Sequence, residues 1–198
     1  MIVAVRRFLA SLLVAGSAAL VPSAPASAAD AGGLIQTMTT EIIEVARTKT
    51  GDDRQAAMRR IVRDNFDIPY VGRLALGMYW DRASEQQKAR FLDAVEASEA
   101  RTYSERLGRH AGYSVIIGTV RSRPDRAWVV ESRLNQAGGL PLKIDWEVHE
   151  SDHGLRVSDV RVEGISMSMI LRSEFSAYIL GRSGEVESLV RELEARAR

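Results

Sequence analysis

The stretch that decides the fold runs from Leu155 to Tyr178 and reads LRVSDVRVEGISMSMILRSEFSAY. Its first half interleaves valine with polar residues, which is typical of a β-strand. Its second half has apolar residues at helical spacing, at positions 165, 169, 170 and 175. Gly164 separates the two halves. We therefore predict a strand that turns into a helix at Gly164, with an apolar cavity opening where sheet meets helix.

Before this stretch, the chain has a helical half and a strand-rich half. Apolar residues recur at helical spacing in four segments between residues 31 and 107, the first of them covering 31–50. The expected N-cap residues are Asp52 or Asp53 for the second helix, Asp67 for the third and Ser84, with Gln87, for the fourth. We expect the third helix to end at about residue 77.

From Gly112 onwards the hydrophobic period changes from helical to alternating. The expected strands are Tyr113–Val120, Arg126–Leu134, Leu142–His149 and Leu155–Glu163. The connections between them are too short for crossover helices, so we predict an antiparallel meander. Two further helices are expected, at 165–180 and after Gly184. Helices, a meander and helices again predict an α+β fold with helices packed on one face of a curved sheet.

The first 28 residues have the pattern of a cleaved export signal. Arg6 and Arg7 precede an apolar segment at 8–20, and Ala26-Ser27-Ala28 offers small residues for cleavage. The apolar segment is shorter than the ~20 residues that span a bilayer. We therefore expect a signal peptide at 1–28 and a single domain at 29–198.

Charge and cysteine content exclude some classes of protein. The chain has 27 Lys and Arg against 26 Asp and Glu, and loss of the two signal arginines leaves a near-neutral product. A nucleic-acid-binding protein would show a basic excess, which is missing here. Without cysteine, the exported chain has no disulfide and its core must hold by packing alone.

Three blocks of sequence resemble the MlaC family, also called the toluene-tolerance family. They are FDIPYVGRLALGMYW at Phe66–Trp80, QQKARF at Gln86–Phe91, and DVRVEGISM followed by RSEF in the stretch described first. Leu155 and Trp146 depart from the residues usual in the family, although both remain apolar. The resemblance implies an NTF2-like curved sheet of about four strands, with N-terminal and C-terminal helices enclosing an apolar lipid cavity.

The resemblance also implies a function in lipid transport. Members are soluble periplasmic carriers that shuttle phospholipids between an outer-membrane lipoprotein complex and an inner-membrane ABC transporter complex, which includes a periplasmic lipid-binding subunit. This role maintains outer-membrane lipid asymmetry. It needs no catalytic residue, no metal and no cofactor, since the bound phospholipid is cargo. A carrier for another apolar lipid, such as a hopanoid, is the alternative within the same class.

The residues expected to bind lipid are apolar and aromatic, and they come from both halves of the chain. They are Tyr79, Phe91, Tyr103, Trp128, Leu142, Ile144, Trp146, Ile165, Met167, Ile170 and Phe175. Periodicity alone favours an ordinary filled core, and such a core would belong to an interaction module without cargo. Only the resemblance favours a cavity.

One motif suggests a different chemistry. His149-Glu150-Ser151-Asp152-His153 matches H-E-x-x-H, the zinc-hydrolase pattern in which two histidines share one helix face. Here the motif ends a predicted strand and crosses a turn, so the two imidazoles are not expected to converge. We interpret both histidines as lying on a hydrophilic hairpin tip, and we keep an exported zinc hydrolase as the alternative from another class.

Overall fold

A computed structural model describes residues 26–107, 112–136 and 139–197. Within these residues the chain forms six α-helices, one 3₁₀ helix and five strands. In chain order they are α1 (Ala28–Thr48), α2 (Gly51–Asn65), α3 (Ile68–Leu76), η1 (Gly77–Arg82), α4 (Glu85–Leu107), β1 (Ser114–Arg123), β2 (Ala127–Asn135), β3 (Leu142–Ser151), β4 (Gly154–Val162), β5 (Ile165–Ser166), α5 (Met167–Leu180) and α6 (Val186–Arg196). The predicted α+β class is confirmed.

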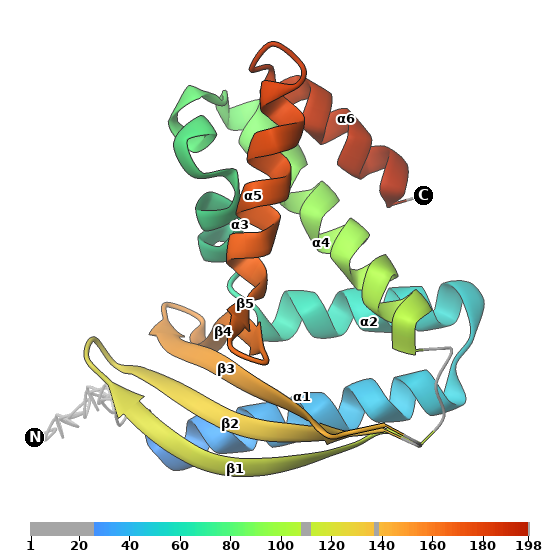
Figure 1. The fold of residues 1–198 in the computed structure, drawn as a ribbon, viewed down its shortest axis with the longest axis vertical. Helices are drawn as coiled ribbons and strands as arrows, with labels where there is room; N and C mark the ends of the chain where they lie inside the picture. The colour runs from blue at the N-terminus through green and yellow to red at the C-terminus, as the bar shows by residue number, and fades with distance from the viewer. Residues whose placement is uncertain (1–25, 108–111, 137–138, 198) are drawn as a thin grey trace, which may run out of the picture.

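The strands form one antiparallel sheet in the order β1-β2-β3-β4-β5, which is the predicted meander with one strand more than expected. Helices α1 and α2 run roughly side by side along the sheet, while α3, α5 and α6 stand away from it (Figure 1). Helix α4 runs from the upper helices down towards α2. The molecule therefore has a sheet-side layer and a helix-side layer, joined by α4.

The additional strand results from a tight turn at the end of β4. Glu163 and Gly164 have φ values of +51° and +82°, and they connect paired residues Val162 and Ile165. Two successive residues with positive φ are typical of a type I′ hairpin. The turn pairs β5 with β4 for two residues before the helix begins. A strand this short has no periodicity to detect, so the sequence predicted helix from Ile165 instead of Met167.

Side-chain caps begin several of the helices as predicted. Asp67 accepts a hydrogen bond from the Tyr70 amide at 2.9 Å, and Ser84 and Gln87 form the expected reciprocal pair at the start of α4. The predicted cap of α2 is wrong. Thr50 is its N-cap, and Asp52 and Asp53 lie in the first turn, where carboxylates favour the positive end of the helix dipole.

Two separate hydrophobic cores stabilise the molecule. The sheet core is formed by the sheet, α1, α2 and the end of α4, and its buried residues are Ala31, Ile35, Met38, Val45, Met58, Ile61, Val62, Ala100, Trp128, Val130, Ile144, Trp146, Val148 and Val157. The helix core is formed by α3, η1, α4, α5 and α6, and contains Ala75, Leu76, Tyr79, Ala83, Phe91, Ala94, Val95, Phe175, Ile179, Val186, Leu189, Val190 and Leu193.

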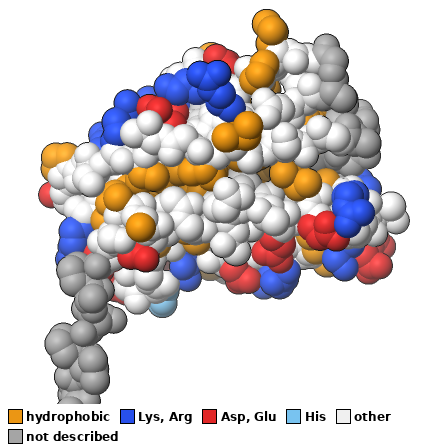
Figure 2. All heavy atoms as spheres, turned by 90° about the horizontal axis from the view of Figure 1, so that it is seen from below, with side chains coloured by type: hydrophobic (Ala, Val, Ile, Leu, Met, Phe, Trp, Pro, Cys, Tyr) orange, Lys and Arg blue, Asp and Glu red, His pale blue; other side chains and the backbone are white. Residues whose placement is uncertain are grey.

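The lower surface of the molecule has a band of hydrophobic side chains with charged side chains on either side (Figure 2). Strand β1 is the sheet edge on this side, and its Ile116 is 59% exposed. Arg121 and Arg123 end the strand, and its register shifts between Ile117 and Val120. Charges and an irregular register both discourage pairing with another strand.

Candidate functional site

A narrow apolar pocket lies where the sheet core meets the helix core. Its volume is about 50 Å³. It receives residues from α2, the α2–α3 connection, α3, α4, β4 and α5, and we call it the inter-core pocket. Its lining residues are Val62, Phe66, Ile68, Val71, Val95, Glu96, Glu99, Tyr103, Asp159, Val160, Met167, Ser168 and Leu171.

The α2–α3 connection forms one wall of this pocket and ties it to the sheet. Phe66 ends α2 and lies beside Val157 of β4 in an isolated parallel bridge. The Asp67 amide donates to the Val157 carbonyl at 2.9 Å, which fixes the chain where it passes from the sheet core to the helix core. Phe66 and Ile68 flank this anchor and contribute apolar side chains to the pocket.

The opposite wall is the strand-to-helix corner after β4. The Asp159 carboxylate is buried and accepts a hydrogen bond from the Ser168 amide at 3.1 Å. Ser166 accepts from the Met169 amide at 3.2 Å and is the N-cap of α5, as expected for a serine in this position. The first bond holds the start of α5 against β4 and the second caps the helix, and Met167 and Leu171 of α5 line the pocket.

Helix α4 supplies three polar groups to a lining that is otherwise mostly apolar. Burial raises the pKa of Glu96, but hydrogen bonds from Arg63 and Arg59, at 2.6 and 2.7 Å, outweigh burial and leave its pKa lowered. Burial raises the pKa of Glu99, which forms no hydrogen bond or ion pair with another described residue. Burial, with a smaller effect of Glu99, raises the pKa of Tyr103 to about 12.

The sequence-predicted lipid-binding residues are distributed over several places. Tyr103 and Met167 line the inter-core pocket. Trp128, Ile144 and Trp146 belong to the sheet core, and Tyr79, Phe91 and Phe175 to the helix core. Leu142 is half-buried in β3, while Ile165 and Ile170 are 58% and 38% exposed and lie outside the pocket.

The indole of Trp146 is hydrogen-bonded inside the sheet core. Its indole Nε1 donates to the Ser132 hydroxyl at 2.9 Å, and this hydroxyl donates to the Ile144 carbonyl at 3.1 Å. A buried tryptophan needs a partner for its N–H group, and Ser132 on the neighbouring strand provides it. Trp146 is thereby held in one orientation inside the core.

The two histidines of the H-E-x-x-H string have different surroundings. His149 Nε2 lies 2.8 Å from the Asp67 carboxylate, its ring packs edge-on against Tyr70, and its side chain is 21% exposed. His153 lies exposed in the turn after β3. The expectation that both lie on a hydrophilic tip is therefore wrong for His149. Within the described ranges, no three His, Asp or Glu side chains gather closely enough to hold a metal ion.

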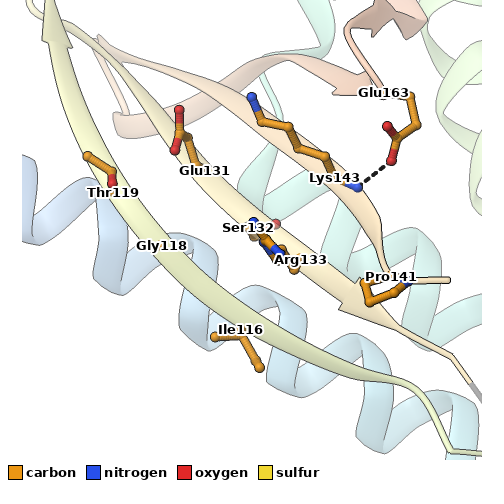
Figure 3. Close-up of a pocket in the computed structure, with 9 residues that line it drawn as sticks. All are labelled: Ile116, Gly118, Thr119, Glu131, Ser132, Arg133, Pro141, Lys143 and Glu163. Atoms are coloured by element: carbon orange, nitrogen blue, oxygen red, sulfur yellow. Dashed lines mark hydrogen bonds between the residues drawn. The ribbon is translucent and has the colours of Figure 1, made fainter.

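A second hollow, of about 390 Å³, lies on the face of the sheet turned away from the helices (Figure 3). It is open and has a mixed lining, in which Ile116 and Pro141 lie beside Glu131 of β2, Lys143 of β3 and Glu163 of the turn after β4. The Glu163 carboxylate accepts from the Lys143 amide at 2.6 Å. Its charged side chains suit a solvated surface, and it is separate from the junction of the two cores.

Most residues of the inter-core pocket were missed by sequence reasoning, because they come from five elements that each contribute only a few side chains. One signal was nevertheless present. Phe91, Val95 and Tyr103 mark one stripe of α4 at intervals of four or eight residues, and Glu99 lies on the same stripe. A carboxylate in the middle of an apolar stripe indicates a polar group directed into the interior.

Comparison with known proteins extends these observations. A model of the MlaC protein family matches residues 35–195. The fold is also similar to a phospholipid-binding protein from Ralstonia solanacearum, solved in complex with a phospholipid, with a TM-score of 0.70 and 22% sequence identity over 84% of this chain and 96% of that one. Among the described residues, no helix has both the length and the hydropathy to cross a membrane.

Proposed function

Since the chain belongs to the MlaC family, we propose that it is a phospholipid carrier that holds acyl chains between its sheet core and its helix core. It acts by binding and release and not by catalysis. The observation that carries this proposal is the inter-core pocket, because apolar side chains from both cores meet there without joining into one continuous core. The similar Ralstonia protein, which was solved with a phospholipid, supports the same cargo.

The pocket must widen to accept its cargo. The pocket has a volume of only about 50 Å³, far less than the acyl chains of a phospholipid occupy. Acyl chains therefore enter only if the two cores move apart. Aromatic and aliphatic side chains deeper in the two cores, including Trp128, Ile144, Phe91 and Phe175, would then extend the site beyond Tyr103 and Met167.

A carrier of this kind solves a specific physical problem. Each methylene group buried from water contributes roughly 0.8 kcal/mol, so a phospholipid with some thirty methylenes faces a barrier on the order of 20 kcal/mol to cross water unaided. A protein pocket that covers the acyl chains removes most of this barrier.

We propose that the protein is exported by the signal at 1–28 and carries lipid through the periplasm. It would move lipid between an outer-membrane lipoprotein complex and an inner-membrane ABC transporter complex.

Two methionines on the first turn of α5 give a matched test. Met167 lines the inter-core pocket, while Met169 is 50% exposed and is not part of the lining. Met167→Glu places an unpaired charge among apolar side chains, which is costly next to acyl chains. We expect the purified Met167→Glu protein to lose most of its phospholipid, as measured by extraction and mass spectrometry, and Met169→Glu to retain it.

The same measurement separates the alternatives. If folded Met167→Glu retains as much phospholipid as the unaltered protein, the inter-core pocket is not the lipid site. Extraction of a hopanoid instead of phospholipid would change the cargo and leave the carrier function in place. Loss of lipid in Ile165→Glu would extend the site over the exposed corner at β5. Metal analysis tests the remaining alternative, since stoichiometric zinc that depends on His149 and His153 would indicate the hydrolase.

A further inference from the structure

Glu99 is the unpartnered charge of the inter-core pocket. The other two carboxylates in the lining are compensated: Glu96 by Arg59 and Arg63, and Asp159 by the Ser168 amide at the start of α5. Glu99 lies half-buried between Val95 and Tyr103 on the same stripe of α4. No hydrogen bond or ion pair connects it to another described residue, so only water can solvate its charge.

Charged groups from the surrounding elements act on Glu99 only at a distance. Arg106 of α4 and Arg196 of α6 favour its charged form, while Glu174 of α5 opposes it. Tyr103 is the neighbour one turn along α4, and its pKa is itself raised by burial and by Glu99. Asp159 of β4 and Glu96 add further negative charge to the lining, and the Arg59 and Arg63 side chains of α2 are engaged by Glu96. Burial is the largest influence on Glu99 and raises its pKa.

We propose that Glu99 takes up a proton when lipid enters, so that it is a carboxylate in the lipid-free protein and a carboxylic acid beside bound acyl chains. This inference rests on the proposed carrier function. Acyl chains that fill the pocket displace the water that solvates Glu99. An unpaired carboxylate in an apolar environment is so unfavourable that such groups bind a proton instead.

Because lipid binding takes up a proton, lipid affinity must decrease as the pH rises. The pKa of Glu99 is higher with lipid bound than without it, so the complex binds more protons between these two pKa values. Lipid affinity is therefore highest below the lipid-free pKa and decreases as the pH rises towards the lipid-bound pKa. The decrease is at most about tenfold per pH unit for one proton. A low pH, at which Glu99 is protonated, would favour lipid binding, and a higher pH would favour lipid release.

The test compares three proteins, each stripped of lipid. A phospholipid with a fluorescent acyl chain is titrated into the unaltered protein, Glu99→Gln and Glu85→Gln at several values between about pH 5 and about pH 8, within the range where shifted carboxyls titrate. Glu85 is the control because it lies on the same helix and its side chain is 89% exposed. We expect the unaltered protein and Glu85→Gln to bind several-fold more weakly at the high end, whereas Glu99→Gln binds tightly and equally throughout.

Calorimetry of the unaltered protein gives a readout that needs no variant. Titration in two buffers with different ionisation enthalpies should show net uptake of protons on lipid binding near neutral pH. Lipid binding without proton uptake, and with the same pH profile in Glu99→Gln, would overturn this inference and leave the carrier function standing. Absence of lipid binding by all three proteins at every pH would overturn the carrier function itself, and the inference with it.

Discussion

At the scale of single residues, Asp67 connects three parts of the chain. Its carboxylate caps α3 and accepts from His149 of β3, while its amide donates to Val157 of β4. His149→Ala removes one partner of a partly buried charge, so we expect a loss of about 1–3 kcal/mol in the free energy of unfolding. His153→Ala is the matched control, expected to stay within about 0.5 kcal/mol because His153 is exposed. Urea denaturation of both variants measures the difference, and equal stabilities would contradict a structural role for the His149–Asp67 contact.

At the scale of elements, the turn before β5 depends on backbone conformation more than on contacts. An added Cβ at Gly164 would meet no atom within 4 Å, but φ is +82° there. Gly164→Ala should therefore cost about 1–2 kcal/mol from backbone strain alone. Gly33→Ala makes the same chemical change at an exposed, open position inside α1, where alanine should gain about 0.5–1 kcal/mol. Thermal unfolding of both proteins measures the two effects. A Gly164→Ala protein of unaltered stability would show that alanine adopts this backbone conformation without strain.

The elements that the sequence predicted well are those with long, regular periodicity. The alternation in β3 and the capping pair at Ser84 and Gln87 were sufficient to place their elements. Strand β5 and the 3₁₀ helix η1 were missed because two and six residues are too few to show a period. The candidate site was harder to predict because its lining is assembled across two cores. Only Tyr103 and Met167 among the expected residues lie in it.

At the scale of the whole molecule, helix α4 and the Phe66–Asp67 connection hold two cores together around one narrow pocket. Phe91 of α4 belongs to the helix core and Ala100, two and a half turns later, to the sheet core. Once the cores have moved apart to admit it, a ligand in the inter-core pocket contacts both cores at once, so its binding energy opposes any further separation. Lipid should therefore stabilise the contacts between the sheet core and the helix core, and not the contacts within either core alone.

Hydrogen exchange measured by mass spectrometry, with and without phospholipid, tests this expectation. Amides that exchange when the cores separate should be protected by lipid both on α4 and at the corner between β4 and α5, in peptides covering 95–103 and 160–171. The hollow on the outer face of the sheet, at Thr119, Arg133 and Lys143, which we call the outer groove, serves as the internal control because it shares no lining residue with the inter-core pocket. Met167→Glu should abolish the protection of both peptides together, since one ligand produces both effects. Protection confined to the outer groove would move the lipid to the far face of the sheet and contradict a site between the cores.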